Sequence, residues 1–161
     1  MLVLAPSLTV QLISCTIACI GFGLWFNVKG IQVVYSGIGA FFTWLTYSLV
    51  YEATSSNFQA TLIASVFVAI YAQIMARVNR APATIFLTVC VFPLVPGPNL
   101  YYMMYYIVME DLKVAKEEAL TLLLTCLGIA LGFIVVEIFN KYVMIMYKKI
   151  KGQPITEHGD H

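Results

Sequence analysis

Pro93-Leu94-Val95-Pro96-Gly97-Pro98-Asn99 is the stretch of sequence that decides the fold of this chain. It lies in the middle of a run from Ala81 to Met109 that contains no charged side chain. A run of this length is long enough to cross a bilayer as a helix. Three prolines and a glycine at its centre are incompatible with a continuous helix, because proline lacks an N–H and its ring clashes with the preceding turn.

This break favours a binding site over a simple bend. The residue before each proline is expected to leave the α region. Irregular backbone inside a membrane is tolerated only where it is packed in protein or lines a polar cavity, and in secondary transporters it marks the substrate site. The alternative is a proline kink in a packing helix. A kink needs one breaker, so three prolines and a glycine make that alternative weaker.

The composition is that of an integral membrane protein. Of 161 residues, 61% are hydrophobic and 11% are charged, whereas soluble domains are nearer half apolar and a quarter charged. A net charge of +1 does not suggest a nucleic-acid partner. The charges cluster between uncharged runs, and at about 20 residues per crossing these runs have room for five spans.

The expected fold class is therefore an all-α membrane protein with one transmembrane domain covering residues 1–161. The predicted spans are 7–27, 31–51, 58–76, 82–109 and 119–139, with the fourth broken at 93–98, and a basic tail follows at 141–161. The first span lacks a positive n-region, so we expect it to be retained rather than removed as a signal peptide. Asn57 is expected to cap the third span and Asn99 the second half of the fourth.

The loop charges predict the orientation. Lys29, Arg77, Arg80 and the basic tail fall on one side of a five-span topology, whereas the two other loops are acidic or carry more acidic than basic residues. The positive-inside rule then places the N-terminus outside and the C-terminus in the cytoplasm of a cell whose inner or plasma membrane holds the protein. Two pairs of small residues, Gly37/Gly39 and Gly128/Gly132, predict surfaces for close helix packing.

The ends of the two half-helices suggest what the site would bind. A helix N-terminus can hold an anion with backbone N–H groups, and the first half-helix leaves carbonyls free for an ammonium group. A small amino acid or carboxylate suits such a site. The candidate substrate-binding residues are the break, two tyrosines beside it, and an asparagine that is otherwise a helix cap: Pro93, Pro96, Gly97, Pro98, Asn99, Tyr101, Tyr102 and Asn27.

Proton coupling has one candidate. Glu137 is an acidic residue within reach of the bilayer core, where a carboxylate can relay protons. Lys141 lies four residues later, so an ion pair along one helix is the alternative. The four cysteines lack the spacing of a metal site, and nucleotide, redox and hydrolytic motifs are absent from the sequence. We therefore expect no cofactor and no enzymatic activity.

The sequence resembles the small five-span subunit of the threonine/serine exporter family, the module that forms the C-terminal membrane part of fused exporters. The resemblance rests on Gly21-Phe22-Gly23 leading to Phe26-Asn27-Val28, on Pro93-x-x-Pro96-Gly97 followed by Tyr101, and on the ending Tyr147-Lys148-Lys149. It implies export of threonine and serine, or of a dicarboxylate such as succinate, driven by the proton gradient. It also implies a larger partner subunit with five spans of its own.

Three functions remain open from the sequence. The first is one half of a heteromeric exporter. The second is a homo-oligomeric transporter or channel that needs no partner beyond membrane lipid and its substrate. The third is a scaffold that stabilises the larger subunit without transporting. A scaffold has no need for a polar break inside the membrane, and a channel is expected to show a ring of charges or carbonyls, so the exporter is favoured.

Overall fold

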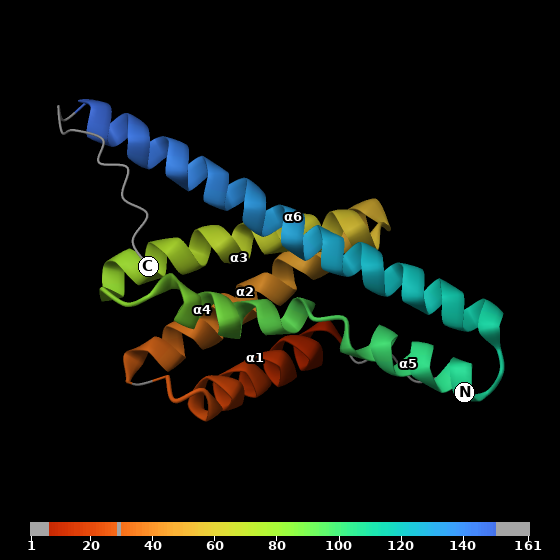
Figure 1. Ribbon diagram of the computed structural model, residues 1–161. Helices are drawn as coiled ribbons and strands as arrows, with labels where there is room; N and C mark the ends of the chain where they lie inside the picture. The colour runs from red at the N-terminus through yellow and green to blue at the C-terminus, as the bar shows by residue number, and fades with distance from the viewer. Residues whose placement is uncertain (1–6, 29, 151–161) are drawn as a thin grey trace.

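The computed structural model describes residues 7–28 and 30–150, and the side chains of these residues as far as residue 146. The chain forms helices, arranged side by side in a bundle (Figure 1). In chain order they are α1 (Leu8–Trp25), α2 (Ile31–Thr54), α3 (Asn57–Asn79), α4 (Ala83–Val91), the short 3₁₀ helix η1 (Phe92–Leu94), α5 (Gly97–Val108) and α6 (Leu112–Ile150). The predicted all-α membrane fold is confirmed.

The described helices can account for five spans. Four of them, α1, α2, α3 and α6, are each long and apolar enough to cross a membrane. The α4–η1 segment and α5 together qualify as a fifth, with a bend of 48° between them. Lys29 and the tail from Lys151, including His158 and His161, lie outside the described residues.

Helix α3 is the centre of the bundle and packs against α2, α4 and α6. Its buried residues are small, as in Ala60, Ala64 and Ser65, and α2 buries Ser36, Gly37 and Gly39. Small residues let helix backbones approach closely. In a bilayer there is no hydrophobic driving force between helices, so this close van der Waals packing is a main source of their association energy. The predicted close-packing role of Gly37 and Gly39 is confirmed, because a Cβ at either position would collide with a neighbouring side chain.

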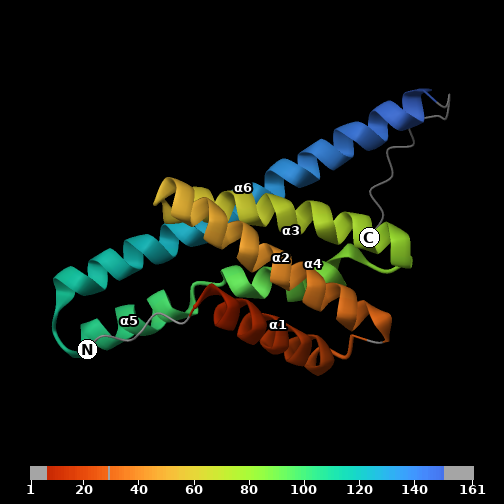
Figure 2. The same cartoon turned by 180° about the vertical axis from the view of Figure 1, so that it is seen from behind.

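The long helix α6 joins two parts of the molecule. Near its middle, Gly128 and Gly132 lie against α3, where a Cβ on Gly132 would collide with Ser65 and approach the Leu62 carbonyl oxygen at 3.1 Å. Its first turns instead lie beside α5, and this pair extends beyond the ends of α1 to α4 (Figure 2). Helix α6 begins at Leu112, so most of the acidic segment before the predicted fifth span is helical.

The break differs from the expectation in its details. Val95, before Pro96, is extended at φ −64° and ψ 122°, as predicted. Phe92, before Pro93, keeps α-helical angles, and Gly97, before Pro98, is already the first residue of α5. Proline is compatible with the first turn of a helix because the N–H it lacks has no partner there. The α-helix therefore ends at Val91 and gives way to the 3₁₀ turn η1, and the chain leaves helical geometry at Val95 and Pro96.

The two predicted asparagine caps are wrong. Helix α5 begins at Gly97 with Pro96 in the capping position, so Asn99 is the third residue of the helix. Helix α3 begins at Asn57 itself, with Ser56 in the capping position, and it has no side-chain cap. Both asparagines are instead free to bond to other helices.

Candidate functional site

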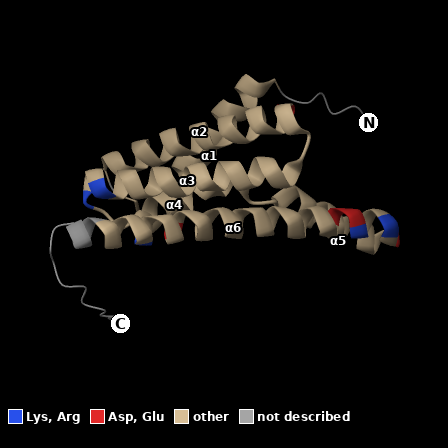
Figure 3. Cartoon of the chain, turned by 90° about the horizontal axis from the view of Figure 1, so that it is seen from above, with Lys and Arg blue, Asp and Glu red and all other residues tan. Residues whose placement is uncertain are grey.

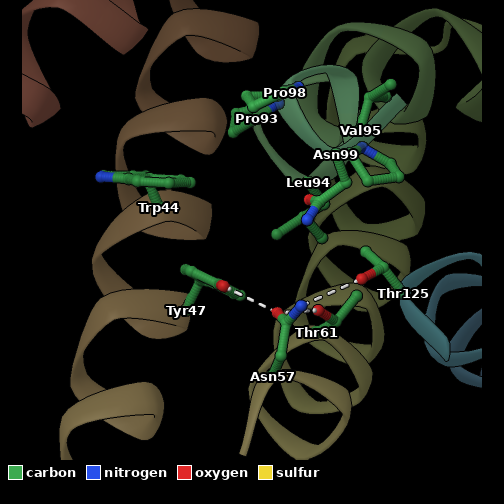
Figure 4. A pocket seen from close by; sticks show the side chains of 11 residues that line it. Trp44, Tyr47, Asn57, Thr61, Pro93, Leu94, Val95, Pro98, Asn99 and Thr125 are labelled. Carbon is green, nitrogen blue, oxygen red and sulfur yellow. Dashed lines mark hydrogen bonds between the residues drawn. The ribbon is translucent and has the colours of Figure 1, made fainter. Parts of the chain in front are cut away.

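The break lines a cavity of about 180 Å³. Its walls come from α2, α3, α6 and the break (Figure 4). The lining residues are Trp44, Tyr47, Asn57, Thr61, Pro93, Leu94, Val95, Pro96, Pro98, Asn99 and Thr125. We call this space the break cavity. None of these side chains is charged, and the volume is below the 300–1,000 Å³ typical of drug-sized ligands, so the cavity suits a small polar molecule.

Asn57 is the polar centre of the break cavity and connects three helices. Its Oδ1 accepts a hydrogen bond of 2.8 Å from the Tyr47 hydroxyl of α2, and its Nδ2 donates to Thr125 Oγ1 of α6 at 3.1 Å (Figure 4). The Thr61 hydroxyl donates to the same Oδ1 at 3.5 Å. These bonds fix the orientation of the amide in the cavity wall.

The prolines leave backbone groups unpaired at the break. Leu94 lies four residues before Pro98, so its carbonyl lacks the usual helical donor. Among the described residues, neither the Leu94 carbonyl nor that of Pro93 receives a backbone hydrogen bond, whereas Phe92 O accepts from Val95 N at 3.2 Å. These two carbonyls belong to residues that line the cavity and could accept from an ammonium group.

The start of α5 offers fewer N–H groups than expected. Pro96 and Pro98 have none, and Gly97 N donates to Val95 O at 2.8 Å. In the described part of the chain, the N–H of Asn99 is the first at this end without an acceptor. The Asn99 side chain donates from Nδ2 to Glu118 Oε2 of α6 at 2.8 Å. An anion at this helix end would therefore be held by one backbone N–H rather than by several.

The remaining predicted site residues do not line the break cavity. Tyr101 and Tyr102 are 66% and 47% exposed. The ring of Tyr101 stacks on that of Tyr105, and the ring of Tyr102 lies at a tilt to that of Tyr106. Gly97 belongs to the break but does not line the cavity. Asn27 has a positive φ of 58° and donates its N–H to Leu24 O, so it ends α1 in a left-handed turn, as the capping alternative predicted.

Glu137 also lies away from the break cavity. It is exposed on α6, twelve residues or about 18 Å along the helix from Thr125. Among the described residues it forms no ion pair with Lys141. The described residues contain no group of three or more side chains that could hold a metal ion.

Sequence reasoning missed one wall of the cavity. The sequence alone singles out none of the lining residues Trp44, Tyr47, Thr61 and Thr125. The available signal was polarity, because hydroxyls and amides inside spans tend to face the protein rather than lipid. Asn57 was noticed, but its position beside a turn favoured a capping role.

A family model described as "Threonine/Serine exporter, ThrE" matches residues 11–139. The chain belongs to the threonine/serine exporter family. The match covers α1 to α5 and most of α6, so the break cavity of this exporter lies wholly within it. The searches of curated proteins and of solved structures gave no match. As a member of this family, the protein is a multi-pass membrane transporter.

Proposed function

We propose that this chain is one subunit of a proton-coupled secondary exporter of small amino acids or carboxylic acids, threonine and serine or a dicarboxylate such as succinate, and that it works with a larger membrane subunit. The observation that carries the proposal is the break cavity. It places an interrupted helix against the amide of Asn57 and the unpaired carbonyls of Pro93 and Leu94. Transporters use this combination to hold small charged substrates.

We also propose that the C-terminal end of the bundle faces the cytoplasm of a cell bounded by an inner or plasma membrane. Arg77 bonds to Asn140 at 2.7 Å, which brings the end of α3 beside the second half of α6. The basic residues Arg77 and Lys141 therefore share one end, and the acidic start of α6 lies at the other (Figure 3). This distribution is the one that the positive-inside rule associates with a cytoplasmic C-terminus.

Counterflow into proteoliposomes tests the function. Labelled threonine, serine and succinate are offered to vesicles that contain this chain alone, and then to vesicles that also contain a five-span partner of the same family. We expect uptake only with the partner. Selective uptake by the chain alone would favour a self-sufficient homo-oligomer, and the absence of uptake in both preparations, with the proteins folded, would favour a scaffold.

Two carboxylates of α6 compete for the coupling role. We propose Glu137 because it lies inside the predicted fifth span, within reach of the bilayer core. Glu118 is the rival, because it is half-buried and accepts a hydrogen bond from the cavity-lining Asn99. If Glu137 couples, Glu137→Gln should abolish the pH dependence of net transport and spare exchange. The same result from Glu118→Gln, with Glu137→Gln unchanged, would transfer the role to Glu118.

A further inference from the structure

A second cavity lies beside the break cavity, between α1 and α2. It has a volume of about 380 Å³ and is lined by Leu8, Gln11, Trp44, Tyr47, Ser48, Tyr51 and Glu52. We call it the vestibule. Trp44 and Tyr47 line both cavities, so these two side chains form the partition between them. Among the described residues that line either cavity, Glu52 alone is charged.

The partition is part of an aromatic row on one face of α2. Trp44 and Tyr47 stack with ring centroids 5.1 Å apart, and Tyr47 and Tyr51 stack at 6.0 Å. Each half of the partition is held by a different helix. Trp44 Nε1 donates to Gln11 Oε1 of α1 at 3.3 Å, and Tyr47 donates to Asn57 of α3 at 2.8 Å. Motion of α1 or α3 against α2 would therefore change the partition.

The chemistry of the vestibule is selective for cations. Aromatic faces attract an ammonium group through the quadrupole of the ring, and the exposed carboxylate of Glu52 adds a negative charge at the same place. A carboxylate ligand is repelled by that charge. The break cavity has no charged wall, and its nearby groups are an N–H, carbonyls and amides. An amino acid can satisfy both spaces in turn, whereas a dicarboxylate brings a second negative charge to Glu52.

We propose that the vestibule is a selectivity site for ligands that carry an ammonium group, and that Glu52 with the Trp44–Tyr47 partition favours them over dicarboxylates. The proposal takes the break cavity as the substrate site, so it rests on the function proposed above. Glu52 holds the ammonium group, and the Trp44–Tyr47 partition separates this position from the break.

Tryptophan fluorescence of the full-length chain tests the site. The chain has two tryptophans, and Trp25 is 85% exposed at the end of α1, so Trp25→Phe leaves Trp44 as the only reporter. Four probes separate the two charges: L-threonine, L-threoninamide without a carboxylate, 3-hydroxybutyrate without an ammonium group, and succinate. We expect saturable changes with threonine and threoninamide, and none with 3-hydroxybutyrate or succinate over the same concentrations.

Variants then assign the effect to the charge at Glu52. Glu52→Gln should weaken the binding of threoninamide by about three- to tenfold, as expected for loss of an exposed charge pair beside aromatic rings. Glu117→Gln removes an exposed carboxylate that lines neither cavity, and it should bind threoninamide as the parent does. Circular dichroism and gel filtration show whether each variant is folded.

The outcomes separate this inference from the function on which it rests. Equal threoninamide binding by folded Glu52→Gln and parent, tighter binding of succinate than of threonine, or no response to any probe would each overturn the inference. Counterflow of succinate with the partner subunit present would then still support the exporter. If no solute is transported in that assay, the proposed function fails, whatever the fluorescence shows.

Discussion

Along α6, the segment after Thr125 packs against α3, whereas the segment before Thr121 packs against α5, and the two contacts differ in kind. On the α3 side, Gly128 and Gly132 bring the backbones together, and Ser65 donates a hydrogen bond of 3.2 Å to the Gly128 carbonyl. On the α5 side, the helices are joined by the bond from Asn99 to Glu118, and no residue of α5 is buried.

The difference between the two contacts indicates which part of the exporter can move. Interdigitated small residues resist separation, because each contact is lost when the helices part. Helix α5 has no such contact, and it begins at a break where the backbone hydrogen bonds are already interrupted. We therefore interpret α2, α3, α4 and the second half of α6 as the rigid part, and α5 with the first turns of α6 as the part that changes position about Pro96.

The largest expected effect comes from the rigid contact. Gly132→Ala adds a Cβ that would collide with Ser65 and crowd the Leu62 carbonyl, so α3 and α6 must separate. Overpacking of this kind costs about 1–3 kcal/mol. Thermal unfolding in detergent should show a lower midpoint temperature. Gly21→Ala is the matched control, because nothing lies within 4 Å of its added Cβ. Equal stability of the two variants would contradict the rigid-contact interpretation.

At the junction of the two parts, we expect a smaller loss of stability than in Gly132→Ala and a larger loss of substrate binding. Asn57→Leu removes the group that joins Tyr47 to Thr125 across the break cavity. Interhelical polar contacts in membranes contribute about 0.6–2 kcal/mol, so the variant should fold, with weaker threonine binding in a titration. Asn79→Leu is the control, since Asn79 bonds within α3 to Met75. Parent-like threonine affinity in Asn57→Leu would remove the break cavity from the site.

The same comparison shows what the sequence could predict. Charge-free runs and the prolines at 93, 96 and 98 were sufficient for the helices and for the position of the break, because both depend on local chemistry. They were insufficient for the wall formed by Trp44, Tyr47 and Thr125. The bond between Asn57 and Thr125 joins residues 68 positions apart, and which faces meet depends on the crossing of α3 and α6.

The asparagines show the limit most clearly. A capping role and a role between helices require the same side chain at nearly the same position, and a shift of one to three residues in the helix start decides between them. For Asn57 the helix begins one residue earlier than a cap would require, and for Asn99 it begins three residues earlier. Two prolines at the start of α5 were visible in the sequence and already implied that few N–H groups would be free there.

The smallest expected effect concerns the contact between α5 and the first turns of α6. It is measured best by a double-mutant cycle. Asn99→Ala and Glu118→Ala each remove one side of the 2.8 Å bond, and their coupling energy should be about 0.5–1.5 kcal/mol, the net value of a hydrogen bond. Amide hydrogen exchange should increase in α5 for either variant and no further for both, while exchange in α3 stays as in the parent. Glu117→Ala removes the neighbouring exposed carboxylate and should leave α5 protected. Equal loosening by Glu117→Ala, or faster exchange throughout α3, would mean that α5 is not an independently moving part.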